Sequence, residues 1–455
     1  MTVRIRDTLR RETVELTTRE PGRVSMYVCG PTVYDAPHIG NARTAVVFDT
    51  VRRYLQWTGL EVTYVSNVTD VDDKIIERAA AQGRTESAVA AEFEQVYFDQ
   101  MAQLGVREPD VRPHATDSIG LMIELIAELV ERGAAYPVDG QGVYFDVEAD
   151  PGYGELSHRT IEDLRASAGA RVDVDRAKRA PMDFALWKAA KPGEPAWDSP
   201  WGSGRPGWHI ECSAMALDLL GDGFDLHGGG NDLVFPHHEN ERAQAIAAGH
   251  EFARHWIHSG MVVIGGEKMA KSAGNFLTLR DALASYDVRA IRLAMLQTHY
   301  SRAVDLGPTE LEAASAALAK LDALVRRAEQ AGVDPSQGTD DRAVAEFRTA
   351  MDDDFNTPRA LAVVFEASNE ANRAIDAGTP ADAARLIATV VDLASVLGVA
   401  VGVQAGGDAE IDALVRERDE AREARDFARA DAIRDDLAAR GVKLEDGPRG
   451  TTWHR

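Results

Sequence analysis

Val24-Ser-Met-Tyr-Val-Cys29 is a short apolar run between turn-forming residues, and it decides the fold class of this 455-residue chain. A run of this length predicts a buried β-strand. Gly30-Pro31 ends the run, residues 41–56 have an amphipathic helical pattern, and residues 61–66 form a second strand-like run. Strand, loop, helix and strand in this order are typical of a βαβ unit, which predicts a parallel sheet.

Further strands are expected downstream of this unit. Residues 224–230 resemble a strand that enters a glycine loop, and residues 261–264 resemble another, followed by a polar loop at 265–275. In parallel sheets, ligands bind beyond the carboxyl ends of the strands, which is where Cys29 to His38 would lie. Cys212 is also expected at the end of a strand, so the two cysteines are able to meet.

The composition and residue patterns along the chain predict five segments. The expected fold class is α/β: a Rossmann-type parallel-sheet domain with an insertion, then an α-helical bundle and a small C-terminal module. Residues 192–208 are too rich in Pro, Gly and Trp for a regular element. Thr309 with Glu312 predicts a capping box at the start of the bundle, and residues 402–407 predict a linker. The segments are 1–115 and 223–308 for the two halves of the sheet domain, 116–222 for the insertion, 309–400 for the bundle and 408–455 for the module.

Composition and charge exclude several classes of protein. Two cysteines are too few for a disulfide scaffold, and no signal segment or membrane-length apolar run is present, so a cytoplasmic protein is expected. A net charge of −24 argues against indiscriminate polyanion binding. Residues 408–455 hold 10 Lys or Arg with 13 acids, which is consistent with an anion-contacting module or with a solvated helix carrying i,i+4 pairs.

Two thiols, one imidazole and one carboxylate are candidate metal ligands. If Pro236 starts a helix, His237 and Glu241 lie at i and i+4 on one face. With Cys29 and Cys212 they form a plausible tetrahedral zinc set. Alternatively, the cysteines are small buried hydrophobes and His237 caps or packs. No CxxC pair anchors the set, so the spacing alone leaves both interpretations open.

Two other stretches are candidate phosphate sites. Lys268 and Lys271 lie on a small-residue loop after a strand and are placed to neutralise a triphosphate, although a lone KxxK is more often a solvated loop. Pro37-His-Ile-Gly-Asn41 lies at a predicted helix start, where the helix dipole and unpaired amides attract phosphate. Gly40 permits close backbone approach to a nucleotide, whereas a lone histidine at a helix start is more often only a cap.

Together these pieces resemble a known family. His38-Ile-Gly-Asn41 and Lys268-Met-Ala-Lys-Ser272 resemble the HIGH and KMSKS signatures of class I aminoacyl-tRNA synthetases. Further stretches resemble cysteinyl-tRNA synthetases in particular, and they follow in family order through practically the whole chain, closing at Trp453. These stretches are YVCGPTVYD at 27–35, GWHIECSAM at 207–215, HGGGND at 227–232 and FPHHENE at 235–241.

The resemblance implies an enzyme that activates L-cysteine with ATP and Mg²⁺ to cysteinyl-adenylate and transfers cysteine to tRNA(Cys). It implies a monomer, with one zinc ion that selects the substrate thiolate over serine and makes an editing domain unnecessary. It also implies that the bundle and the tail read tRNA, with Arg449, Trp453 and Arg455 as candidate contacts. The implied zinc ligands are Cys29, Cys212, His237 and Glu241. The implied catalytic residues are His38, Asn41, Lys268 and Lys271, and the other substrate contacts are Gly30, Thr32, Gly40, Trp208, Gly230 and Asp232.

Two residues depart from the signatures. Asn41 stands where the family has its second histidine, and Ala270 replaces the first serine of KMSKS. Asparagine keeps a hydrogen-bond donor but carries no charge, so the loss of one charge-assisted bond costs on the order of 1.5–3 kcal/mol unless another group compensates. A working but slower enzyme is expected.

Two other functions compete with the synthetase. A ligase that transfers cysteine to an amino sugar, as in mycothiol synthesis, would share the catalytic half but usually lacks the C-terminal module, and the tail ending in Gly450-Thr-Thr-Trp453 argues against it. A non-catalytic zinc and cysteine sensor would explain Asn41 and Ala270, but His38 and both signature lysines are retained.

Overall fold

The computed structural model describes residues 2–163, 178–269, 276–335, 338–402, 409–440, 442–447 and 450–454. The chain forms two compact units, residues 1–311 with 349–358, and residues 312–348 with 359–455. Several positions named above lie outside the described residues: Ala270, Lys271, Arg449, Arg455 and all but the first residue of the expected linker at 402–407.

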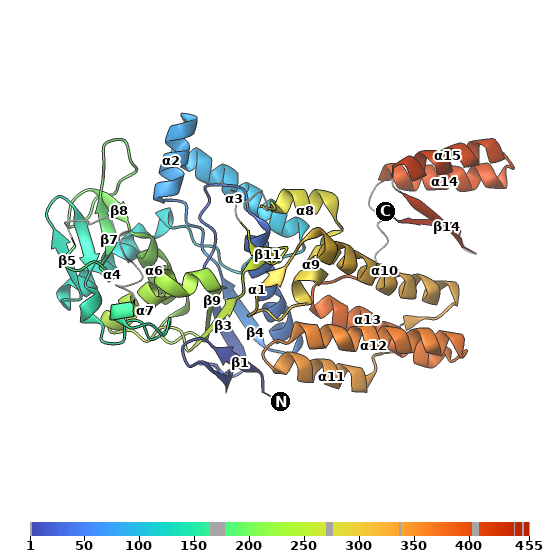
Figure 1. Ribbon diagram of the computed structural model, residues 1–455, viewed down its shortest axis with the longest axis horizontal. Helices are drawn as coiled ribbons and strands as arrows, with labels where there is room; N and C mark the ends of the chain where they lie inside the picture. The colour runs from blue at the N-terminus through green and yellow to red at the C-terminus, as the bar shows by residue number, and fades with distance from the viewer. Residues whose placement is uncertain are drawn as a thin grey trace. The chain divides into compact units, whose positions relative to one another are not determined.

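A four-stranded parallel sheet forms the centre of the first unit, as the sequence predicts. Its order is β10-β9-β3-β4, and every neighbouring pair is parallel. Helix α1 (Ile39–Trp57) connects β3 to β4. Figure 1 shows α1 on the right of β3 and β9, with α6 and α7 on their left. The strands are β3 (Arg23–Val28), β4 (Glu61–Val65), β9 (Leu226–Gly230) and β10 (His255–Ser259), and the two helices are α6 (Trp208–Leu220) and α7 (Glu239–Ala247).

Close packing joins α1 to the sheet. A Cβ atom on Gly228 of β9 would lie 2.2 Å from the ring of Phe48 on α1, a separation that real Cβ atoms do not show. Phe48 is fully buried, so it has no room to move aside. Only glycine at position 228 therefore allows α1 to lie this close to the strand.

The insertion contains a second, antiparallel sheet of order β5-β6-β7-β8. The interpretation of residues 192–208 as lacking a regular element is wrong in part, because Gly204–Pro206 forms strand β8 beside β7. As an edge strand, β8 tolerates the proline that argued against it. The other elements of this region are α4 (Ile119–Glu131), β5 (Ala135–Val138), β6 (Gly142–Phe145) and β7 (Phe184–Ala189).

Shorter elements complete the first unit. An N-terminal hairpin of β1 (Arg4–Asp7) and β2 (Glu12–Glu15) precedes the main sheet. After β10, strand β11 pairs antiparallel with β12 and parallel with β13. The remaining elements are α2 (Asp73–Gln82), α3 (Glu86–Gln103), β11 (Val262–Ile264), β12 (Glu267–Lys268), α8 (Leu279–Ser285), α9 (Val288–Leu296) and β13 (Val304–Asp305).

The C-terminal part is helical, as expected, and ends in a small α/β hairpin module. Helix α10 begins at Pro308, so Thr309 lies inside the helix and the predicted capping box at Thr309 is wrong. Proline is favoured at the first helical position, which displaces threonine from the cap. The elements are α10 (Pro308–Gln330), α11 (Asp341–Asp352), α12 (Thr357–Asp376), α13 (Pro380–Val396), α14 (Ala409–Glu423), α15 (Phe427–Ala439), β14 (Lys443–Gly447) and β15 (Gly450–His454).

A buried ion pair fastens α1 to α9. Arg292 lies 2.5 Å from Asp49, and each side chain is 1% exposed. Burial raises the pKa of Asp49, but the guanidinium groups of Arg292 and Arg53 outweigh this effect and hold the pKa below its usual value. Folding lowers the pKa of Asp49, so the pair stabilises the protein fully at pH values above the unfolded-state pKa of about 3.9. The stabilisation is lost as the pH falls through the lower pKa that Asp49 has in the folded state.

We expect Asp49→Asn to lower the free energy of unfolding by about 3–5 kcal/mol at pH 7, because it leaves Arg292 buried without its anion. Urea unfolding of the full chain measures this. The matched control is Glu61→Gln, which breaks an exposed pair with Arg23 and should change stability by less than about 1 kcal/mol. Equal losses in the two variants would contradict a stabilising role for the buried pair.

Candidate active site and metal centre

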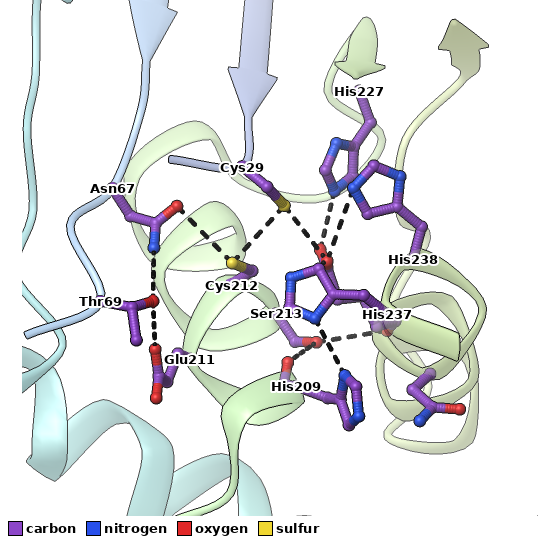
Figure 2. Close-up of polar contacts among 12 residues, drawn as sticks. Cys29, Asn67, Thr69, His209, Glu211, Cys212, Ser213, His227, His237 and His238 are labelled. Carbon is purple, nitrogen blue, oxygen red and sulfur yellow. Dashed lines mark hydrogen bonds and ion pairs between the residues drawn. The ribbon is translucent and has the colours of Figure 1, made fainter. Parts of the chain in front are cut away.

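The two cysteines meet beside the carboxyl end of the central sheet. Cys29 directly follows β3, and its Sγ lies 3.6 Å from the Sγ of Cys212 (Figure 2). The expectation that Cys212 ends a strand is wrong, since it lies in the second turn of α6. Gly207 follows strand β8 and is the residue before the first turn of α6. The helix that begins there directs the buried sulfur of Cys212 toward β3.

The segment after β9 and the first turn of α7 supply the other two donors, His237 and Glu241. Pro236 does not start the α-helix: Val234–His238 forms a π-helical turn in which Phe235 is extended, and α7 begins only at Glu239. His237 Nε2 nevertheless lies 3.0 Å from Glu241 Oε1, so the expected i,i+4 proximity is present.

Four donor atoms thus converge from the end of β3, from α6, from the π-helical turn and from α7. One atom each of Cys29, Cys212, His237 and Glu241 lies within 4.8 Å of all the others. A second set with the same property shares Cys29 and Glu241 but replaces the other two with His227 and His238. Sequence reasoning did not assign these two histidines, although both stand in the stretches that carry the resemblance. The density of histidines around the glycine loop was the available signal.

Glu241 contacts three other members of the two donor sets, Cys29, His227 and His237. Its Oε2 lies 2.7 Å from His227 Nε2, and its Oε1 accepts a hydrogen bond from Cys29 Sγ at 3.3 Å. The carboxylate is fully buried. Burial raises the pKa of Glu241, but the charges and hydrogen bonds of His237 and His227 hold it well below its usual value.

The pKa values of three neighbouring groups, Cys212, His237 and Cys29, are also shifted from their usual values. Burial raises the pKa of Cys212, but hydrogen bonding with Cys29 and the charge of His237 bring it down to about 6. Burial lowers the pKa of His237, but Glu241 and Cys212 raise it to about 10. Burial and the neighbouring Cys212 and Glu241 raise the pKa of Cys29 well above its usual value. These opposite pKa shifts favour a thiolate at Cys212 and a thiol at Cys29, and both sulfurs would be deprotonated as ligands of a metal ion.

An outer layer of residues orients these donors. His209 Nδ1 lies 2.9 Å from His237 Nδ1, which aims Nε2 of His237 toward Glu241. Trp208 stacks on a face of the His237 ring, with centroids 4.0 Å apart and planes at 20°. A buried chain of polar contacts continues from Cys212 through Asn67 and Thr69 to Glu211 (Figure 2).

The donor chemistry fits zinc. Thiolate, imidazole and carboxylate are the ligands that zinc takes, and four donors suit its tetrahedral preference. In the second set, His238 Nε2 has no hydrogen-bond partner within the described part of the chain, and His238 Nδ1 lies 2.7 Å from His258 Nε2. The first set offers two sulfurs and the second only one, which makes the first the softer site.

His38 and Asn41 form the start of α1. Nδ1 of His38 accepts from the amides of Gly40 and Asn41 at 3.1 and 3.3 Å, and Asn41 Oδ1 accepts from the amide of His38 at 3.0 Å. This reciprocal cap leaves the His38 proton on Nε2. A Cβ on Gly40 would lie 2.8 Å from the His38 ring, so glycine lets the ring fold back over the helix start. The first turn contains no acidic residue.

The other predicted contacts lie around the same strand ends. Gly30 donates its amide to Asn67 Oδ1 at 2.9 Å, and Thr32 forms a bridge with Thr69. Gly230 is the last residue of β9, and Asp232 is exposed in the short 3-10 helix that follows. Lys268 is exposed in β12, and Lys271 lies outside the described residues.

Comparison with known proteins assigns three family matches along the chain. Residues 15–316 match the tRNA synthetases class I (C) catalytic domain, residues 346–401 the DALR domain, and residues 405–453 the cysteinyl-tRNA ligase anticodon binding domain. The last match is to the kind of module that an amino-sugar ligase usually lacks. None of the described helices has the length and apolar character needed to cross a membrane.

Relatives and solved structures agree with these matches. The cysteine–tRNA ligase of Alkalilimnicola ehrlichii is 53% identical, with 96% of each chain covered, and that of Halorhodospira halophila is 51% identical with the same coverage. Mycobacterium tuberculosis methionyl-tRNA synthetase in complex with methionyl-adenylate shares the fold, with a TM-score of 0.59, 17% identity and coverage of 83% and 90%. The LeuRS of Agrobacterium radiobacter K84 gives a TM-score of 0.62 at 11% identity, with 84% of each chain covered.

The fold class expected from the sequence is therefore confirmed, and so is the resemblance. The family matches extend over most of the chain, and the curated relatives are covered almost end to end. The chain belongs to the cysteine–tRNA ligase family of class I tRNA synthetases and is a ligase enzyme.

Proposed function

We propose that this enzyme joins L-cysteine to ATP as cysteinyl-adenylate, releases diphosphate, and transfers cysteine to tRNA(Cys). The convergence of Cys29, Cys212, His237 and Glu241 beside the carboxyl ends of the strands is the observation that supports this proposal most directly. These four residues hold one zinc ion. When bound, zinc supplies a borderline-soft Lewis acid that favours a thiolate over a serine hydroxyl.

The chain's own residues hold cysteine in place. Trp208 and Thr32 line the cysteine pocket, and Trp208 also fixes the plane of His237 by stacking. Shape alone would distinguish cysteine from serine poorly, because small differences within a pocket yield only about 1–3 kcal/mol. Direct recognition of sulfur would make a separate editing site unnecessary.

ATP binds over the start of α1. His38 donates from Nε2 to a phosphate oxygen, and the positive end of the helix dipole adds to the attraction because the first turn has no acidic side chain. Lys268 and Lys271 neutralise the leaving diphosphate, which Mg²⁺ accompanies. Gly30, Gly40, Gly230 and Asp232 contact the nucleotide, with Asp232 accepting from ribose hydroxyls, and Asn41 supports His38 through the reciprocal cap.

The C-terminal half recognises the tRNA. The bundle contacts the stem and the terminal module contacts the anticodon, in a monomeric enzyme divided at the boundaries 1–115, 116–222, 223–308, 309–400 and 408–455. The module has a core of its own from α14 and α15, which suits a separate binding unit; its buried members are Ile411, Val415, Ile433, Leu437 and Val442.

Metal analysis and ATP–diphosphate exchange on one preparation test the proposal. We expect one zinc per chain, exchange that depends on cysteine and not on serine, and loss of exchange when zinc is chelated. Adding tRNA(Cys) should consume the adenylate, whereas an amino sugar should not. Cysteine-selective exchange in a zinc-free preparation would contradict the role of the metal, and no exchange in a zinc-loaded one would contradict adenylation.

A further inference from the structure

A cleft of about 590 Å³ opens beside the proposed nucleotide site. Five parts of the first unit form its walls: the N-terminal hairpin, the insertion loop at residues 156–159, the segment after β9, strand β10, and the turn after α9. Asn231, Asp232 and His258 are among its lining residues. The cleft therefore adjoins the end of β9, where the ribose is expected.

Exposed positive charge surrounds this cleft. Arg6, Arg11 and Arg159 line it, and all three are exposed. Among the residues that the structure describes, none of the three has a carboxylate within ion-pair distance. Asp7 also lines the cleft, but its carboxylate is fully buried and paired with Arg10 at 2.8 Å. The exposed carboxylate of Asp232, which also lines the cleft, offsets one of these three positive charges. In a chain of net charge −24, the remaining positive excess makes the cleft a local basic site.

The walls of the cleft are tied together. His158 Nε2 donates to the backbone carbonyl of Thr8 at 2.8 Å, which joins the insertion loop to the N-terminal hairpin. The amide of Arg6 donates to Asp354 Oδ1 at 2.8 Å, which holds the hairpin from the other side. Hydrogen bonds thus hold the backbone segments that carry the arginines in place, although the arginine side chains themselves are exposed.

An aromatic ring lies among these charges. The guanidinium of Arg159 lies 5.7 Å from the ring centre of Phe235, and the ring is only half-buried. Proteins that bind single-stranded nucleic acid combine arginine with partly exposed aromatic rings, so that phosphates contact the cations and bases stack on the rings.

We propose that this cleft binds the single-stranded 3′ end of the tRNA, with backbone phosphates on Arg6, Arg11 and Arg159 and a base against Phe235. The proposal rests on the proposed function, because it is the terminal adenosine that receives cysteine. Since Asp232 lines the same cleft, a strand whose last nucleotide reaches the adenylate passes these arginines. ATP phosphates share the same chemistry, so the test must separate the two sources.

The triple variant Arg6→Gln/Arg11→Gln/Arg159→Gln tests the assignment in the full-length enzyme. We expect kcat/KM for tRNA in aminoacylation to fall by about 10- to 100-fold, mainly through KM, while kcat/KM for ATP in tRNA-free exchange falls far less. Each phosphate contact on a single strand contributes about 0.7 to the slope of log affinity against log salt. The salt dependence of tRNA binding should therefore weaken by about 2 on that scale.

Arg132→Gln is the matched control. Arg132 is an exposed arginine at the end of α4, outside the lining of the cleft, and no salt bridge to it is found in the described part of the chain. It should leave the salt slope and the KM for tRNA at wild-type values. Equal losses in exchange and aminoacylation would assign the arginines to ATP, and an unchanged salt slope would overturn phosphate binding. If exchange failed in the wild-type enzyme as well, the proposed function itself would be wrong.

Discussion

Replacing Cys212 with serine is expected to reduce cysteine-dependent ATP–diphosphate exchange by at least about 100-fold and to abolish stoichiometric zinc. Loss of a partner outside the first coordination shell of a metal already costs about 10- to 100-fold, and loss of a ligand is more severe. Serine preserves the volume of the side chain but offers a hydroxyl that is hard and far less acidic than the thiol. Metal content and exchange rate, measured on the same sample, give the two readouts.

His238→Gln is the informative comparison, because His238 belongs only to the second donor set. If the metal sits on the Cys29, Cys212, His237 and Glu241 set, this variant keeps its zinc and most of its exchange activity. The reverse pattern, with zinc retained in Cys212→Ser and lost in His238→Gln, would move the metal to the second set. Thermal unfolding of both variants shows whether either protein has failed to fold, which would also remove zinc and activity.

Replacing His38 with asparagine is expected to lower the exchange rate by about 10²–10³-fold with little loss of stability. Asparagine is a good N-cap and keeps an acceptor for the amides of Gly40 and Asn41. It does not reproduce the reach of the Nε2 donor, and losing one donor to charge that develops in a transition state costs this much in other enzymes. Exchange at saturating ATP and thermal unfolding are the two measurements.

His38→Ala separates the two roles of the residue. It should lose the same activity and, in addition, about 1 kcal/mol of stability, because the cap disappears as well. An asparagine variant with full activity would limit His38 to capping. An alanine variant as stable as the asparagine variant would show that the reciprocal cap contributes little.

The sequence predicted the parallel sheet well because its signals are local. The apolar runs at β3 and β4 and the helical pattern between them lie within one short segment, where periodicity reports burial directly. The helical character of the C-terminal half was also predictable for this reason. The start of α10 was not predicted correctly, because Pro308 and Thr309 both favour a helix start and the helix begins at Pro308.

The metal cluster depends on contacts between distant parts of the chain. Residue types and resemblance were enough to name four candidate donors, but no local pattern places Cys212 on a helix or makes a π-helical turn of residues 234–238. The roles of His209 and His227 were missed for a related reason. Their partners, His237 and Glu241, lie 28 and 14 residues away, beyond the range of any periodicity.

The contact between Gly228 and Phe48 limits how the amino-acid specificity of this enzyme can be redesigned. A library that randomises β9 to reshape the pocket should return only glycine at position 228, because even alanine would push on a buried ring. That ring belongs to the helix that His38 caps, so any displacement would be passed to the proposed phosphate site. Under the proposed function, Thr32 and Trp208 lie outside this contact and are therefore the positions to vary first.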